Sequence, residues 1–329
     1  MTPLLKLLAA AGLAVAGVAS AAAEPAGRLV LYTSQPNEDA QATVDAFRAK
    51  YPAVEVEWFR EGTTKVMAKL EAEFAAGAPQ PDLLLIADTV TMEGLKQAGR
   101  LMAHPDADVS AYDPAIMDPD RTYFSTKLIT TGIVTNANSD AEVTSWTDLV
   151  DPALEGQVVM PSPLTSGAAL VHVATLAQHP DFGWGYVERL AANRTIAQGG
   201  NGAVFRAVAG GEKTAGIVID YLPIREKAAG APVEFVFPDE GVSAVTEPVA
   251  ILSTAANPEA AKAFVDFLLS PEGQELARAQ GYIPAHPDVA LPEGFPDRSQ
   301  IRLMPFDAAA ALASAEADKL RFAELFGAN

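Results

Sequence analysis

Strand and helix patterns alternate through the first hundred residues, and this alternation constrains the fold most. Apolar segments at 28–33 and 82–87 are typical of strands, an alternating segment at 54–59 is a third strand, and helical patterns at 37–50 and about 63–76 separate them. The segment 82–87, DLLLIA, is continuously apolar after its aspartate, as expected of a strand covered on both faces. This β-α-β-α-β order predicts an α/β fold with a doubly wound, mostly parallel sheet.

A second set of strand and helix patterns follows directly, with strands expected near 127–135 and 215–219. A chain of this length usually divides into two lobes. Because no linker composition separates the two sets, we expect the chain to cross between lobes more than once. The apolar extended segments Thr130–Thr135 and Ser243–Ile251 are the predicted crossing strands.

The predicted organisation follows from these crossings. Lobe 1 comprises residues 24–130 plus 248–300, and lobe 2 comprises residues 131–247. Residues 301–329 carry an alanine-rich C-terminal helix that docks on a lobe.

The N-terminus has the pattern of a secretory signal peptide. Lys6 precedes an uncharged apolar run, Leu7–Val18, and small residues up to Ala23 offer a cleavage site. The run is short for a membrane span of about 20 residues. The sequence has no cysteine, which excludes disulfides, thiolate metal sites and a lipid-modified N-terminal cysteine. We therefore expect residues 1–23 to be removed and the mature protein to be periplasmic without a lipid anchor.

The net charge of −19 limits the partners of the chain. Such an acidic protein repels nucleic acid and anionic lipid, so no nucleic-acid partner is expected. The same acidity also serves solubility alone, and it does not identify a ligand.

Residues Asn257–Pro287, NPEAAKAFVDFLLSPEGQELARAQGYIPAHP, form two short helical patterns. Asn257 and Ser270 are the expected N-caps, each followed by proline, and Gly281 is the expected left-handed end. This pattern resembles a segment of bacterial extracellular solute-binding proteins, which feed ABC importers. The resemblance implies a two-lobed type II periplasmic-binding fold, a monomer that captures ligand by lobe closure and delivers it to an inner-membrane permease. We expect the segment to pack as outer helices of one lobe, away from the ligand.

Ligands of open α/β sheets collect at the carboxyl ends of strands, where helix N-termini favour anions. The predicted strand ends are rich in hydroxyls and small residues. Any one of these residues can serve only as a helix cap, but several together predict a site. The candidate ligand-binding residues are Thr33, Ser34, Gln35, Asp88, Thr89, Thr165, Ser166, Gly167, Asn201 and Tyr221.

From Leu29 to about Pro287 the chain resembles the ferric-iron-binding branch of these proteins. The matching segments are LVLYTSQ, WTDLVDP, TSGAALV, and GIVIDY followed by EPVAIL. In that branch two adjacent tyrosines at this strand end coordinate Fe³⁺, whereas here Leu222 follows Tyr221. Tyr221 is therefore the only candidate metal ligand, and iron would need a synergistic anion to complete its coordination.

The leading hypothesis for the ligand is a small oxyanion of the phosphate-ester or phosphonate class, with transported ferric iron as the alternative. Arg60, Lys65, Lys127 and Arg206 are possible sources of positive charge, and the sequence does not say which enters the cleft. A periplasmic ligand sensor is a second class of function. An enzyme is not expected, because the sequence has no recognisable nucleophile and base, no P-loop and no histidines at ligand spacing. No resident cofactor is expected.

Overall fold

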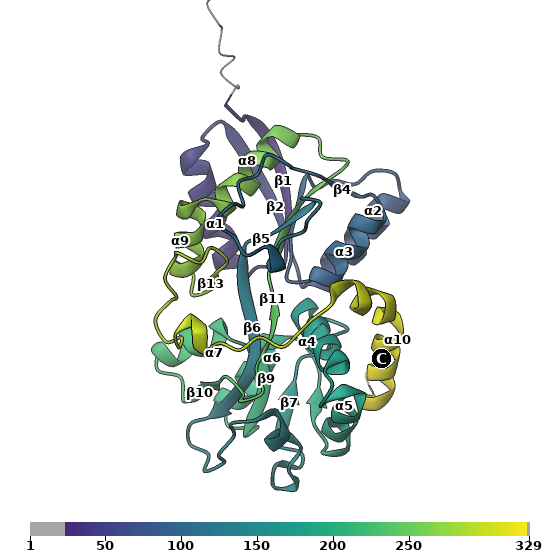
Figure 1. Cartoon of the computed structure of the whole chain (residues 1–329), viewed down its shortest axis with the longest axis vertical. Coiled ribbons are helices and arrows are strands. Elements are labelled where there is room, and N and C mark those ends of the chain that lie inside the picture. The colour runs from purple at the N-terminus through teal and green to yellow at the C-terminus, as the bar shows by residue number, and fades with distance from the viewer. Residues whose placement is uncertain (1–23, 328–329) are drawn as a thin grey trace, which may run out of the picture.

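The structure, a computed structural model, describes residues 24–327. The predicted signal peptide, residues 1–23, lies outside the described residues. The described chain forms two α/β lobes stacked along the long axis of the molecule (Figure 1). This architecture confirms the predicted fold class.

The sheet of lobe 1 has the strand order β2-β1-β3-β12-β4, with β5 paired to β12. Its strands are β1 (Gly27–Thr33), β2 (Val54–Arg60), β3 (Leu83–Leu85), β4 (Leu101–Met102), β5 (Tyr123–Ser125) and β12 (Pro248–Leu252). β1 is parallel to β2 and β3, whereas β12 is antiparallel to its neighbours. The late return of the chain through β12 therefore adds an antiparallel strand to the predicted parallel sheet.

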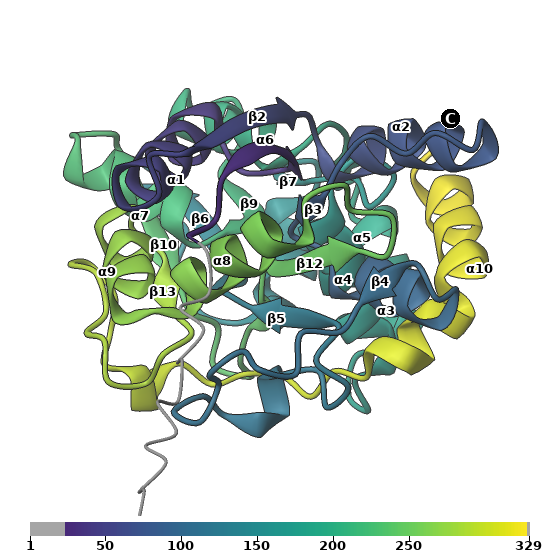
Figure 2. The same ribbon diagram turned by 90° about the horizontal axis from the view of Figure 1, so that it is seen from above.

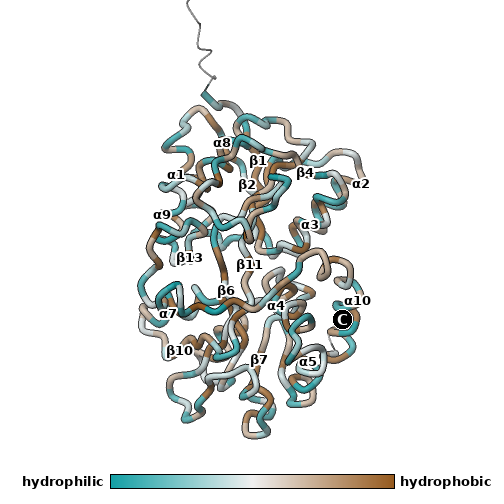
Figure 3. The backbone as a smooth tube through the Cα atoms, viewed as in Figure 1, coloured by the Kyte–Doolittle hydropathy of each residue, from teal (hydrophilic) through white to brown (hydrophobic). Residues whose placement is uncertain are grey.

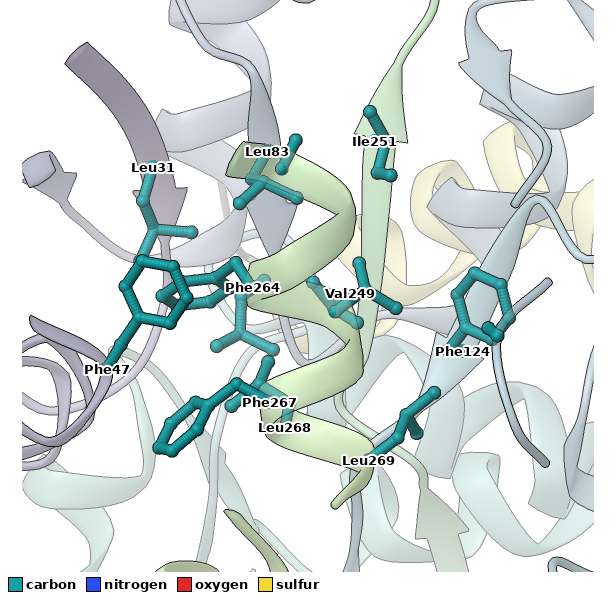
Figure 4. Close-up of a cluster of buried hydrophobic side chains, with 14 of the residues drawn as sticks. Leu31, Phe47, Leu83, Phe124, Val249, Ile251, Phe264, Phe267, Leu268 and Leu269 are labelled. Carbon is teal, nitrogen blue, oxygen red and sulfur yellow. The ribbon is translucent and has the colours of Figure 1, made fainter. Parts of the chain in front are cut away.

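Helices cover both faces of this sheet. They are α1 (Asn37–Lys50), α2 (Thr63–Ala75), α3 (Thr89–Gln97), α8 (Pro258–Leu269) and α9 (Pro271–Ala279). Leu83 and Leu85 of β3 join the core under α1 and α8, where the rings of Phe47 and Phe264 are 4.8 Å apart (Figure 4). Leu84 faces the other way, into the core under α2 and α3. The two-sided burial predicted for this strand is confirmed.

The sheet of lobe 2 has the order β10-β6-β9-β7-β8, with β11 and β13 paired to β6. Its strands are β6 (Lys127–Asn136), β7 (Val158–Met160), β8 (Ile196–Ala197), β9 (Ala215–Ile219), β10 (Val233–Val236), β11 (Ser243–Val245) and β13 (Ile283–Pro284). Its helices are α4 (Gly167–Gln178), α5 (Gly183–Ala192), α6 (Asn201–Ala209) and α7 (Tyr221–Ala228). Short 3-10 turns span Pro114–Ile116, Trp146–Val150, Pro152–Leu154 and Arg298–Gln300. Hydrophobic residues concentrate along the strands of both lobes (Figure 3).

Two of the passages of the chain between the sheets lie side by side. β5 continues into β6 across Thr126, and β11 continues into β12 across Thr246 and Glu247. Thr126 binds both neighbours, because its N–H donates to the Thr246 carbonyl at 3.2 Å and its hydroxyl to the Glu247 carbonyl at 2.8 Å. The first crossing thus lies before the expected segment Thr130–Thr135, which belongs wholly to β6, and the second lies within Ser243–Ile251.

The C-terminal helix α10 (Ala308–Phe326) contacts α3 of lobe 1 as well as α4 and α5 of lobe 2 (Figures 1 and 2). Phe322 is buried in the lobe 2 core, and Arg321 pairs with Glu188 of α5 at 2.6 Å. Leu312 packs against Gly94 of α3. The helix therefore touches both lobes, whereas the sequence predicted docking on one. Within residues 24–327, no helix combines the length and apolarity that a membrane crossing needs.

Candidate functional site

A cleft of about 660 Å³ lies between the two lobes. Residues of β-strand ends and helix N-termini form most of its wall. Its lining includes Ser34, Glu38, Arg60, Gly62, Thr63 and Ala87 from lobe 1, Thr165, Ser166, Gly167, Gly200, Asn201, Gly202, Tyr221, Leu222, Arg225 and Glu226 from lobe 2, and Glu247 from a crossing segment. Such a volume is typical of small-molecule sites.

The cleft brings together Ser34, Thr165, Ser166, Gly167, Asn201 and Tyr221 from the predicted set. These residues are far apart in the sequence and come from both lobes. Their convergence follows from the position of each at the end of a strand or the start of a helix that points at the interlobe space.

The other predicted residues lie behind the cleft wall. The Thr33 hydroxyl donates to the Leu85 carbonyl at 2.8 Å and accepts from the Gln35 N–H at 3.1 Å, so it fastens a buried turn. Asp88 caps α3 by accepting from the Thr91 N–H at 3.0 Å, and Thr89 is the first residue of that helix. The Thr33 and Asp88 side chains thus satisfy backbone groups that the fold leaves unpaired.

Ser34 and Ser166 are well placed to donate to an anion. The Ser34 oxygen accepts from the Ala87 N–H at 3.0 Å. The Ser166 oxygen accepts from the Ala169 N–H at 3.3 Å and from the Asn201 side-chain amide at 3.4 Å. Because a hydroxyl that only accepts keeps its own hydrogen for donation, both groups can still donate toward the cleft.

Helices α2 of lobe 1 and α4 and α6 of lobe 2 begin at the cleft. Their N-caps, Gly62, Ser166 and Gly200, all line it. The first turns of a helix carry unpaired N–H groups and the positive end of the helix dipole. Each of these helix N-termini therefore favours negative charge, while Glu38, Glu226 and Glu247 also line the cleft.

Glycine permits a close approach of the lobes here. A Cβ atom on Gly167 would lie 2.5 Å from the Ala87 carbonyl oxygen, and one on Gly62 would lie 3.3 Å from the Thr165 carbonyl oxygen. Each glycine faces backbone of the opposite lobe. In this structure the two lobes are therefore in contact around the cleft.

Two arginines supply positive charge to the lining. The Arg60 guanidinium is oriented by a 2.6 Å bond from Nε to the Gln35 carbonyl. Arg225, which sequence reasoning missed, lies four residues after Tyr221 and therefore on the same face of α7. The four-residue spacing from Tyr221 is the sequence signal that could have identified Arg225. Lys127 is instead buried in an ion pair with Glu247 at 2.6 Å.

Glu247 forms the floor of the cleft at the second crossing. Its backbone has a φ of +37°, which is rare for a residue other than glycine. Burial raises the pKa of this carboxyl, and the Lys127 ammonium opposes the shift. The Gln35 side-chain amide is 3.5 Å from the same carboxylate, while its oxygen has no partner in the described part of the chain.

Tyr221 is packed rather than free. Its ring lies 4.5 Å from that of Tyr282, and the Arg225 guanidinium lies 4.4 Å from its centroid. Burial raises the pKa of the Tyr221 hydroxyl, which favours the neutral phenol. Tyr282 belongs to the segment Asn257–Pro287, so that segment reaches the residues directly behind the cleft, whereas the sequence suggested only outer helices.

Comparison with known proteins identifies the family. Residues 28–283 match the model of the bacterial extracellular solute-binding protein family. The chain belongs to this family. The solute-binding protein is also 32% identical, over 83% of its own length and 81% of the relative, to an uncharacterized protein of Haemophilus influenzae. The family comprises periplasmic proteins that bind solutes for ABC transporters, which confirms the resemblance found in the sequence.

Solved structures show the same fold. The periplasmic binding protein AfuA of Actinobacillus pleuropneumoniae, with exogenous fructose-6-phosphate bound, has a TM-score of 0.81 and 27% identity, covering 92% of this chain and 99% of AfuA. Iron-bound HitA of Pseudomonas aeruginosa has a TM-score of 0.79 and 20% identity, covering 90% and 99%. The fold is thus shared by proteins with different ligands.

Proposed function

We propose that this solute-binding protein captures a small oxyanion of the phosphate-ester or phosphonate class in the interlobe cleft. The observation that carries the proposal is the convergence of the N-termini of α2, α4 and α6 with Arg60 in one cleft. Helix N-termini and a guanidinium together bind the oxygens of a phosphoryl group through charge-assisted hydrogen bonds.

The remaining lining suits an organic ester. The cleft volume of about 660 Å³ accommodates more than an inorganic anion. Ser34 and Ser166 add neutral donors. The similarity to AfuA, seen with fructose-6-phosphate, supports this class of ligand.

In this proposal the protein works by transport rather than catalysis. Residues 1–23 direct export, and the mature monomer acts in the periplasm without a lipid anchor, because the sequence has no cysteine. Lobe closure around the ligand precedes delivery to an inner-membrane ABC permease. A periplasmic sensor on the same fold would bind the same ligand without stimulating transport. Uptake that requires this chain together with its permease distinguishes the two.

Ferric iron is the second candidate ligand, and Tyr221 at the cleft is the observation that favours it. Fe³⁺ would be cargo held by this phenolate and an accompanying anion. Within residues 24–327 no group of three or more His, Cys, Asp or Glu side chains is placed to hold a metal. A visible charge-transfer band on addition of Fe³⁺ that is lost in Tyr221→Phe would establish the iron function instead.

Calorimetric titration with fructose-6-phosphate, 2-aminoethylphosphonate and inorganic phosphate tests the proposal. We expect an organic phosphate or phosphonate to bind, with affinity about tenfold lower or worse in Arg60→Met, since a charged hydrogen bond is lost. Arg100→Met is the matched control, because Arg100 pairs with Glu71 on the surface of lobe 1 away from the cleft. No binding of any of the three ligands, or equal losses in both variants, would refute the proposed ligand class.

A further inference from the structure

A group of residues joins the two lobes at one flank of the cleft. We call it the interlobe latch: Asp39, Arg225, Gly281 and Tyr282. Arg225 projects from α7 of lobe 2, and Asp39 lies in the first turn of α1 in lobe 1. The two terminal nitrogens of Arg225 lie 3.2 and 3.1 Å from the two carboxylate oxygens of Asp39. This is a bidentate ion pair across the lobes.

Lobe 1 is shaped to receive this arginine. Gly281 has a φ of +83°, and a Cβ atom there would lie 3.2–3.3 Å from Cγ, Cδ and Nε of Arg225. The arginine stem therefore lies across the space that the glycine leaves. The Arg225 guanidinium is 5.3 Å from the Tyr282 ring centroid and 4.4 Å from that of Tyr221, and these two rings lie 4.5 Å apart.

Asp39 is also held by the segment that follows α9. The Tyr282 hydroxyl donates to its Oδ2 atom, and the Gln280 side-chain amide donates to its backbone carbonyl at 2.9 Å. Its side chain is 6% exposed. The carboxylate is thus held by bonds that do not involve Arg225, which reduces the entropy lost when the pair forms.

Arg225 pairs with Asp39 and also lines the ligand cleft. Asp39 does not line the cleft. We propose that Asp39 is a positioning residue: its ion pair with Arg225 forms as the lobes close, stabilises the closed arrangement and orients Arg225 toward the ligand. Ligand affinity then depends on a carboxylate that does not touch the ligand. Exposed ion pairs stabilise little, but this one is bidentate, rests on a buried carboxylate and has its guanidinium close to two aromatic rings.

The first measurement is the distance between the lobes in the ligand-free protein. Because the sequence has no cysteine, single cysteines at exposed Ala76 and Glu212, one in each lobe, accept nitroxide labels without background. In pulsed electron-spin spectra we expect Asp39→Asn to shift the interlobe distances toward a more open arrangement. Tyr282→Phe, which removes only the hydroxyl that orients Asp39, should shift them in the same direction by less.

Asp118→Asn is the matched control. Asp118 is a buried carboxylate that pairs with Lys96 entirely within lobe 1. It should lower stability without changing the interlobe distances. Distances in Asp39→Asn that equal those of the wild type, or an equal change in Asp118→Asn, would overturn the proposal.

The second measurement is the affinity for fructose-6-phosphate, and this part rests on the proposed function. We expect affinity to fall about tenfold in Asp39→Asn, as for loss of a charge-assisted pair, and to be unchanged in Asp118→Asn. Unchanged affinity in Asp39→Asn would contradict the coupling. If the wild type binds no organic phosphate, the proposed ligand class is refuted. The interlobe distances of the ligand-free protein still test the proposal for the interlobe latch.

Discussion

Lys127 and Glu247 form an ion pair of 2.6 Å that joins two adjacent segments by which the chain crosses between lobes. Their side chains are 4% and 2% exposed. We expect Lys127→Met to destabilise the protein by about 3 kcal/mol, because it leaves a carboxylate buried without its partner. The double variant Lys127→Met with Glu247→Gln should recover part of this loss. Urea unfolding measures the stability of both variants. A stability of Lys127→Met within about 1 kcal/mol of the wild type would mean that the ion pair contributes little.

Gly167 allows α4 to approach the opposite lobe. A Cβ atom there would meet the Ala87 carbonyl oxygen at 2.5 Å and the Asp88 Cβ at 2.8 Å. We expect Gly167→Ala to hold the lobes apart and to weaken ligand binding tenfold or more, by about 1.4 kcal/mol at least, without unfolding either lobe. The control is Gly185→Ala in α5, where an added Cβ meets nothing within 4 Å. Equal affinities of the two variants would show that close approach at Gly167 is not needed.

Asp220 makes stability depend on pH in mildly acidic solution. This buried carboxyl accepts from the Thr130 N–H at 2.9 Å and the Thr130 hydroxyl at 2.7 Å, yet burial raises its pKa to about 6. The folded state therefore holds a proton that the unfolded state has released between about pH 4 and 6. Stability falls as pH rises through this window.

The comparison with Asp220→Asn isolates this contribution. Relative to the variant, the free energy of unfolding of the wild type should fall by roughly 2 kcal/mol between pH 4 and pH 6 and by only about 0.4 kcal/mol more above it. Unfolding free energies at pH 4, 5 and 6 test this. A difference that stays constant, or grows in favour of the wild type, would contradict the raised pKa.

His172 makes stability depend on pH in the opposite direction. The ring is buried in α4, Nδ1 lies 2.8 Å from the Ser243 hydroxyl, and burial lowers its pKa to about 3. Unfolding below pH 6.5 therefore takes up a proton, and stability falls as pH decreases toward 3. Relative to His172→Gln, the free energy of unfolding of the wild type should fall by about 1.4 kcal/mol for each unit by which the pH decreases in this range. Equal slopes in urea titrations of both proteins would argue against a neutral buried histidine.

The sequence predicted the elements and many of their ends. Asn257 and Ser270 cap their helices as expected, with the Ala260 and Gly273 N–H groups donating to their side chains. Local rules suffice for these positions, since a cap bonds within its own helix. Ser166 was predicted for the same reason, because it closes the loop after a strand and caps a helix that points at the interlobe space.

The remaining site residues depend on contacts that sequence patterns do not contain. Thr33 and Asp88 have the same side-chain chemistry as a ligand-binding residue, and only the fold shows that they bond to backbone behind the cleft. Arg225 acquires its role from docking on the other lobe. The first crossing was misplaced by a few residues because β6 is continuously buried, so its apolar pattern marks no boundary.

The central claim is that helix N-termini from both lobes bind the oxyanion. Amide resonances of the ¹⁵N-labelled protein, followed during titration with fructose-6-phosphate, test it most directly. We expect saturable shifts at Thr63, Gly167 and Gly202, which lie in the first turns of α2, α4 and α6. Saturable binding that leaves these three amides unshifted, with changes confined to other parts of the protein, would contradict it.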